Sequence, residues 1–148
     1  MNAPLLNDEY FMRLALTEAR QAAEEGEIPI GAIIVCNDKV IARAHNRSEA
    51  LLDTTAHAEL MAITSAQNYL GSKFLTDCTL YVTIEPCVMC AGAMRWARPA
   101  RVVWGADEPK SGFSRFSKEI FHPKTLVTSG VLADECAELM RSFFVSRR

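Results

Sequence analysis

The sequence lacks any apolar run that approaches the roughly 18 residues of a membrane-spanning helix. Residues 1–10 also lack the basic and apolar regions of a secretory signal. Basic residues are not in excess, because 16 Lys and Arg stand against 18 Asp and Glu, for a formal net charge of -2. These absences predict a cytoplasmic protein and exclude binding to nucleic acid by overall positive charge alone.

No linker rich in Pro, Gly or Ser, no internal repeat and no low-complexity tract interrupts the chain. With 148 residues, 49% of them hydrophobic, the sequence predicts one domain spanning 1–148 that buries its own core. The five cysteines are an odd number. In a reducing compartment such cysteines more often serve metals or catalysis than disulfides.

Hydrophobic periodicity predicts helices alternating with strands. An opening hairpin followed by alternating strands and helices indicates an α/β fold of three layers, with a mixed sheet between helices. The expected order is a helix over 8–25, hairpin strands over 28–36 and 39–45, a helix from Thr55 to Tyr69, a strand over 79–84, a helix over 87–97, strands over 101–106 and 126–129, and a helix over 133–147. Residues 107–124 are polar and irregular.

Two short clusters carry the residue types that bind transition metals. His57 begins one predicted helix, and Cys87 and Cys90 lie in the first turn of the next. Residues three apart share a helix face, and a helix N-terminus favours the thiolate that binds metal. One imidazole and two thiolates suit zinc, and three protein ligands leave a position open for water. No fourth ligand is offered by the other cysteines, which stand alone at unrelated spacings: Cys36, Cys78 and Cys136.

Glu59, two residues after His57, is the candidate proton carrier. Zinc lowers the pKa of a bound water from about 15.7 to about 7, and hydrolysis then needs a group that moves protons. At a helix start the first backbone amides lack intrahelical partners. The N–H of Ala58 or Glu59 is therefore a candidate donor to an atom of the substrate ring.

Each feature also has a simpler interpretation. Taken alone, Cys87-x-x-Cys90 fits a redox dithiol as well as a metal site, and a structural zinc module is a third reading. The nearby His57 and Glu59 favour catalytic zinc. Asn46 is a turn residue on local grounds, or an amide that reads a ring nitrogen. A basic loop with two aromatic residues is either a solvated loop or a surface that holds a nucleic acid strand: Lys110, Phe113, Arg115, Phe116, Lys118 and Lys124.

His-x-Glu followed by Pro-Cys-x-x-Cys is the signature of zinc-dependent base deaminases. Over nearly its whole length the chain resembles the bacterial tRNA-specific adenosine deaminases of the cytidine deaminase superfamily. The His and Cys clusters define only the superfamily. The resemblance is carried by segments 27–32, 55–59, 79–94 and 130–136, and the tRNA branch is indicated by 29–32, 107–112 and 130–132.

The resemblance implies a cytidine deaminase-like sheet of five strands, a homodimer, and one Zn²⁺ per chain. It also implies conversion of adenosine to inosine at the wobble position of a tRNA anticodon stem-loop, with Glu59 as the catalytic residue. The implied metal ligands are His57, Cys87 and Cys90. The implied substrate-binding residues are Asn46, Ala58 and Lys110.

Two departures from the family pattern leave an alternative substrate open. The stretch 113–124 is more compact than in the relatives, which puts some tRNA contacts in doubt. The run Trp96-Ala97-Arg98-Pro99 resembles guanine deaminases, which act on a free base. A deaminase of a free nucleobase or nucleoside, such as guanine or cytosine, is therefore the second hypothesis.

Overall fold

The structure is a computed structural model that describes residues 6–147. Residues 1–5, which form half of the stretch predicted not to be a secretory signal, and residue 148, the end of the predicted domain, lie outside the described range. Across residues 6–147, no helix combines the length and the apolar character needed to cross a bilayer.

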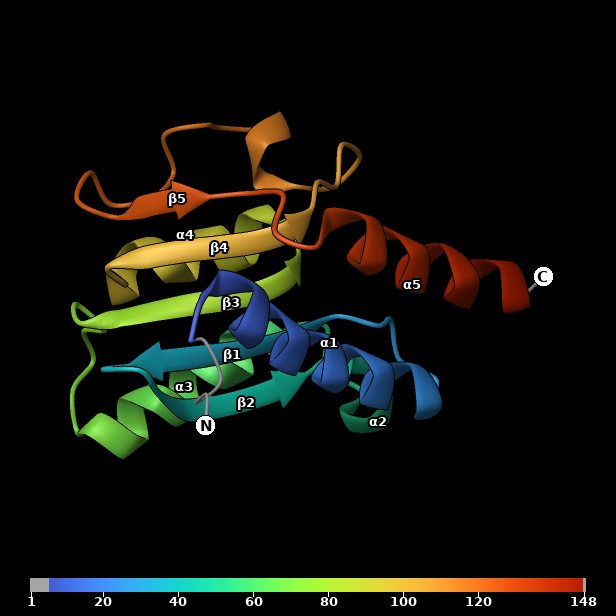
Figure 1. Ribbon diagram of the computed structural model, residues 1–148, viewed down its shortest axis with the longest axis horizontal. Coiled ribbons are helices and arrows are strands. Elements are labelled where there is room, and N and C mark those ends of the chain that lie inside the picture. The colour runs from blue at the N-terminus through green and yellow to red at the C-terminus, as the bar shows by residue number, and fades with distance from the viewer. Residues whose placement is uncertain (1–5, 148) are drawn as a thin grey trace, which may run out of the picture.

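Five strands form one mixed sheet in the order β2-β1-β3-β4-β5 (Figure 1). The first pairings, β2 with β1 and β1 with β3, are antiparallel, whereas β3–β4 and β4–β5 are parallel. The strands are β1 (Gly31–Cys36), β2 (Lys39–His45), β3 (Cys78–Ile84), β4 (Arg101–Ala106) and β5 (Leu126–Thr128). The helices are α1 (Asp8–Glu24), α2 (Ser48–Leu51), α3 (Ala58–Leu70), α4 (Val88–Ala97) and α5 (Ala133–Ser146), with a 3₁₀ turn η1 (Phe113–Arg115).

Helices cover both faces of the sheet, with α1 and α5 on one face and α3 and α4 on the other (Figure 1). Alternation along the strands divides the core into two clusters, because successive strand residues point to opposite faces. Ile33 belongs to the cluster that includes Met12 of α1, whereas its neighbour Ile34 belongs to the cluster that includes Met94 of α4. The predicted three-layer α/β/α sandwich with a five-stranded mixed sheet is confirmed.

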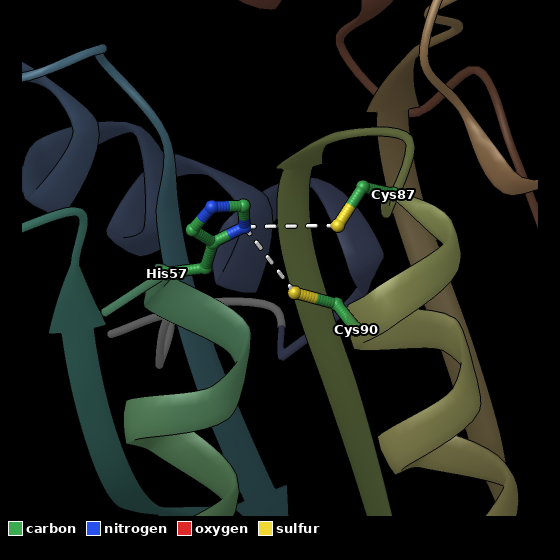
Figure 2. A group of neighbouring side chains, drawn as sticks. All are labelled: His57, Cys87 and Cys90. Carbon is green, nitrogen blue, oxygen red and sulfur yellow. Dashed lines mark hydrogen bonds between the residues drawn. The ribbon is translucent and has the colours of Figure 1, made fainter. Parts of the chain in front are cut away.

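The N-termini of α3 and α4 lie side by side on one face of the sheet (Figure 2). His57 is the N-cap residue of α3, and Cys87 is the N-cap residue of α4. Neither side chain makes a capping hydrogen bond. The fold therefore brings the two sequence clusters together and leaves their metal-binding atoms available.

Two local expectations were wrong in detail. The helix expected to start with Thr55 as its cap begins at Ala58 instead, and the backbone N–H and hydroxyl of Thr55 both donate to the Asp53 side chain. The short helix α2 was not expected. Its first backbone amides, at Glu49 and Ala50, donate to the buried carboxylate of Glu27 at 3.0 and 2.8 Å, so a residue far away in sequence stabilises it.

Gly31 marks the closest approach of α1 to the sheet, as expected for a glycine within a strand. A Cβ at this position would lie 2.1 Å from the Ala15 carbonyl oxygen and 2.5 Å from the Ala19 nitrogen. Because both atoms belong to helix backbone, α1 would have to move. We therefore expect Gly31→Ala to lower the free energy of unfolding by about 3 kcal/mol, measured by urea denaturation.

Gly92 in α4 provides the matched control, since a Cβ there would meet nothing within 4 Å. Alanine is favoured over glycine inside a helix by about 0.5–1 kcal/mol. Gly92→Ala should therefore leave stability unchanged or raise it. Equal unfolding midpoints for Gly31→Ala and the unaltered protein would contradict the steric account.

Candidate metal centre

Three potential metal ligands converge between α3 and α4 (Figure 2). The Nδ1 atom of His57 lies 3.7 Å from the Cys87 Sγ and 3.5 Å from the Cys90 Sγ. One ligand atom from each residue lies within 4.8 Å of the others, and no fourth His, Cys, Asp or Glu among residues 6–147 joins the group.

These separations fit a zinc ion. Tetrahedral zinc with Zn–S bonds of about 2.3 Å and Zn–N bonds of about 2.0–2.1 Å holds its nitrogen and sulfur ligands roughly 3.6 Å apart. Both observed distances fall close to this value. One imidazole and two thiolates also match the ligands that zinc prefers. His57 and Cys87 are half-buried and Cys90 is buried, which leaves the cluster partly open to solvent.

The two cysteines differ in their electrostatic surroundings. A hydrogen bond from the Cys90 thiol lowers the pKa of Cys87 to about 4, with a further contribution from His57. The same hydrogen bond, together with burial, raises the pKa of Cys90. The hydrogen bond with Cys87 also raises the pKa of His57. Cys87 is thus held in the thiolate form that binds metal, and a coordinated cation deprotonates a thiol outright.

Glu59 lies in the first turn of α3, and its side chain is buried, with 3% of its surface exposed. Its Oε1 is the only buried side-chain oxygen or nitrogen among the described residues that lacks a hydrogen-bond partner. Burial raises the pKa of Glu59 to about 7. A buried polar atom without a partner costs about 1–3 kcal/mol, so an arrangement of this kind is typical of a catalytic group rather than a structural one.

Asn46 links the end of β2 to the start of α3. Its Oδ1 accepts a hydrogen bond of 2.8 Å from the Ala58 N–H, and its side chain is buried. Because the Ala58 N–H can only donate, the amide oxygen must face it and the Nδ2 group points elsewhere. The contact between Ala58 and substrate stays a prediction, and it would require this N–H to serve a second acceptor.

Lys110 lies in the loop that follows β4. Its side chain is exposed, and its carbonyl oxygen accepts a hydrogen bond of 2.8 Å from Arg115. Phe113, one of the two aromatic residues considered for strand binding, is buried and packs edge-on against Trp104 and Phe121. Of the aromatic pair, only Phe116 remains exposed.

Two surface cavities lie beside α3, one near its N-terminus and one along its length. One of about 490 Å³ opens beside the imidazole of His57 and is lined by the segment around α2: Ser48, Glu49, Leu52, Asp53, Thr54 and His57. A second, of about 950 Å³, lies between α3 and α4 on their outer side and includes Trp96. Trp96 follows Cys87 by nine residues, about 13 Å along a helix, so the guanine deaminase-like run does not contact the metal cluster.

The sheet order and the His/Cys/Cys cluster at two adjacent helix N-termini define a zinc-dependent hydrolytic deaminase. Within that class, the model of the cytidine and deoxycytidylate deaminase zinc-binding region matches residues 6–106. The chain belongs to this family.

The chain is also similar to individual deaminases and to their solved structures. The tRNA-specific adenosine deaminase of Bacillus subtilis strain 168 is 45% identical over 145 residues, which cover 95% of this chain and 90% of the relative. A solved structure from work on A-to-I editing by tRNA:A34 deaminases at the wobble position of transfer RNA is 46% identical, with a TM-score of 0.82, over 88% of this chain and 98% of that one. The guanine deaminase of Bacillus subtilis is 41% identical over 79% of this chain and 78% of its own, with a TM-score of 0.67.

Proposed function

We propose that this enzyme converts adenosine to inosine at the wobble position of tRNA anticodons. The observation that carries the proposal is the relationship to a tRNA-specific adenosine deaminase, whose sequence is 45% identical over 95% of this chain. Sequence identity to the solved tRNA:A34 deaminase structure, 46% over 88% of this chain, also exceeds the identity to the Bacillus subtilis guanine deaminase, 41% over 79%. The site contains the ligands and the buried carboxyl that this chemistry requires.

His57, Cys87 and Cys90 would hold the zinc, which supplies activated water for attack on C6 of the adenine base. Glu59 would accept the two protons that the attacking water gives up, and would pass one to the ring and the other to the departing amine, so that ammonia leaves. Its unpartnered Oε1 is free to take part in both transfers. The surrounding buried residues keep this carboxyl out of bulk water, and its raised pKa of about 7 suits a group that both accepts and donates protons near neutral pH.

Asn46 would orient the base. Its Oδ1 is fixed by the Ala58 N–H, and no hydrogen bond of its Nδ2 is formed with residues 6–147. The Nδ2 group is therefore available to donate to an acceptor nitrogen of the purine. A donor whose orientation is already fixed loses little entropy when the base binds.

The decisive experiment compares an anticodon stem-loop RNA bearing adenosine at the wobble position with free guanine, cytosine and adenosine. We expect inosine in the RNA and no ammonia from the free compounds. Ammonia from a free base, with the RNA unchanged, would move the substrate assignment to the second hypothesis. The second hypothesis has support of its own, because a solved guanine deaminase structure is 41% identical to this chain.

Lys110 would contact the phosphate backbone of the RNA, because it is exposed on the loop that follows β4. Lys110→Ala should raise the KM for the stem-loop about threefold to tenfold and leave kcat nearly unchanged. The rise should be smaller at 300 mM salt, on the order of twofold, because screening weakens phosphate contacts. Steady-state kinetics of both enzymes at two salt concentrations would test this. If the ratio of the two KM values did not change with salt, Lys110 would have no role in binding the RNA backbone.

We also propose that two copies associate through the outer face of α3 and α4. The cavity there is lined by exposed or half-buried apolar side chains, including Leu51, Met61 and Trp96, of which Trp96 has 74% of its surface exposed. Exposed apolar patches with a central aromatic residue are typical of interfaces. Two chains would then share one RNA hairpin in the cytoplasm. Sedimentation should give about twice the 16.4 kDa chain mass, and a single-chain mass across dilution would reject the dimer.

A further inference from the structure

A buried carboxylate that the deamination chemistry does not use lies beside the metal-binding segment. Glu85 follows β3 directly and has 5% of its surface exposed. Its Oε1 accepts a hydrogen bond of 3.1 Å from the Glu108 N–H. Its Oε2 accepts two more from Ser114, one of 3.0 Å from the backbone N–H and one of 2.7 Å from the hydroxyl.

These three hydrogen bonds fix both ends of one loop, residues 108–114. The loop is closed by a hydrogen bond of 2.7 Å from the Gly112 N–H to the Glu108 carbonyl oxygen. It is attached to the metal-binding segment by a bond of 2.9 Å from the Phe113 N–H to the Pro86 carbonyl oxygen, and Gly112 forms a β-bridge with Cys87. The loop therefore folds around the Glu85 carboxylate.

Gly112 shows how closely the loop fits this carboxylate. A Cβ at Gly112 would lie 2.2 Å from the Glu85 Oε2 and 2.5 Å from the Glu108 carbonyl oxygen. A buried carboxylate is tolerated only where donors replace its hydration, and here two backbone amides and a hydroxyl do so. The loop and the carboxylate thus depend on each other, since neither satisfies its polar groups alone.

The loop carries the surface that the proposed function needs for RNA. Lys110 lies between the two attachment points, Glu108 and Ser114, with its side chain exposed. Its carbonyl oxygen is held by Arg115, immediately after the loop. Glu85 lies two residues before Cys87 and accepts the hydrogen bonds that hold this loop. One short segment therefore positions both a metal ligand and the loop that would face the RNA.

We propose that Glu85 is a positioning residue that holds loop 108–114, and with it Lys110, in the geometry that binds the RNA backbone. The proposal rests on the proposed tRNA function. Glu85 is not part of the metal cluster. If loss of the Glu85 hydrogen bonds disorders the loop, RNA must order it on binding, which weakens binding without changing the chemical step.

Glu85→Gln tests the proposal with minimal change in shape. Glutamine has one acceptor oxygen, so its NH₂ group must face the N–H of either Glu108 or Ser114 and leave that amide unpaired. We expect the KM for the anticodon stem-loop to rise about tenfold, while kcat stays within about twofold and zinc remains at about one per chain. Ser114→Ala removes one hydrogen bond of the three and should raise KM about threefold.

Glu119→Gln is the matched control, because Glu119 is an exposed carboxyl on the neighbouring stretch and the substitution removes the same charge. It should leave KM unchanged or slightly lower it. Unaltered KM in Glu85→Gln, or a fall in kcat at constant KM, would overturn the positioning role. If Glu85→Gln loses its zinc, Ser114→Ala decides, and a KM equal to that of the unaltered enzyme then overturns it. Absence of inosine with the unaltered enzyme would instead reject the proposed function itself, and this inference with it.

Discussion

Glu59→Ala is expected to keep its zinc and its fold and to lose activity by a factor of about 10² to 10⁴. The three metal ligands are untouched by this substitution, whereas the buried carboxyl that would carry protons is gone. The fold should weaken only slightly, because the removed Oε1 makes no hydrogen bond with the described residues and its burial is itself unfavourable. Inosine formation, zinc content and the thermal unfolding midpoint, measured on one preparation, check all three expectations.

Glu59→Gln is the sharper companion variant. Glutamine preserves the size and shape of the side chain, but its amide neither accepts nor releases a proton at neutral pH. The loss of activity in this variant should therefore match that of the alanine variant. If glutamine restored more than about a tenth of the activity, Glu59 would act by filling space or by hydrogen bonding. Proton transfer would then have to be assigned to another group.

Cys87→Ala is expected to lose zinc and, with it, all activity. The Cys87 side chain lies at the N-cap position of α4, 3.7 Å from the His57 Nδ1, so its removal leaves two of the three ligands. Since zinc bound only by the folded state contributes to stability, the melting temperature should also fall and should no longer respond to added zinc. Metal analysis after gel filtration, followed by thermal melting with and without zinc, measures both effects.

Cys36→Ala provides the control for thiol loss, because Cys36 is a half-buried cysteine at the end of β1 and outside the metal cluster. It should retain about one zinc per chain and full activity. Stoichiometric zinc in Cys87→Ala would mean that Cys87 is not a required ligand. The assignment of the metal ligands, and of the position left open for water, would then have to be revised.

Most of the fold could be predicted because its main helices are amphipathic and its first strand is a continuous apolar run. In strand β1 the side chains of Ile33 and Ile34 point to opposite faces of the sheet. Both are buried, because helices cover each face. The helices around Met12 and Met94 bury one stripe each. Local patterns of this kind reflect burial, which is set by the sequence itself.

The features that could not be predicted depend on contacts between distant residues. Helix α2 has only four residues and is held by Glu27, more than 20 positions away. His45 lies between the carboxylates of Glu18 and Glu25, at 3.2 and 2.9 Å. Such pairings arise from the way β2 packs beside α1, and no local pattern encodes them.

Sequence spacing indicated the metal cluster because its chemistry requires particular residue types at fixed positions. It did not reveal Glu85, whose hydrogen bonds connect positions more than 20 residues apart. One signal was present: a charged residue directly after the buried run Tyr81 to Ile84. A carboxylate at the end of such a strand must find donors, and it indicates that a loop returns to supply them.

The sheet order also bears on the behaviour of this protein at high concentration. An open sheet presents unpaired backbone groups at its two outer strands, where other chains add to form aggregates. Here one outer strand, β5, has only three residues, and the other, β2, exposes Lys39 and Arg43. Short length and positive charge both hinder strand addition. The native protein is thus a poor template for fibrillar assembly, and concentrated stocks should remain clear as long as the sheet stays folded.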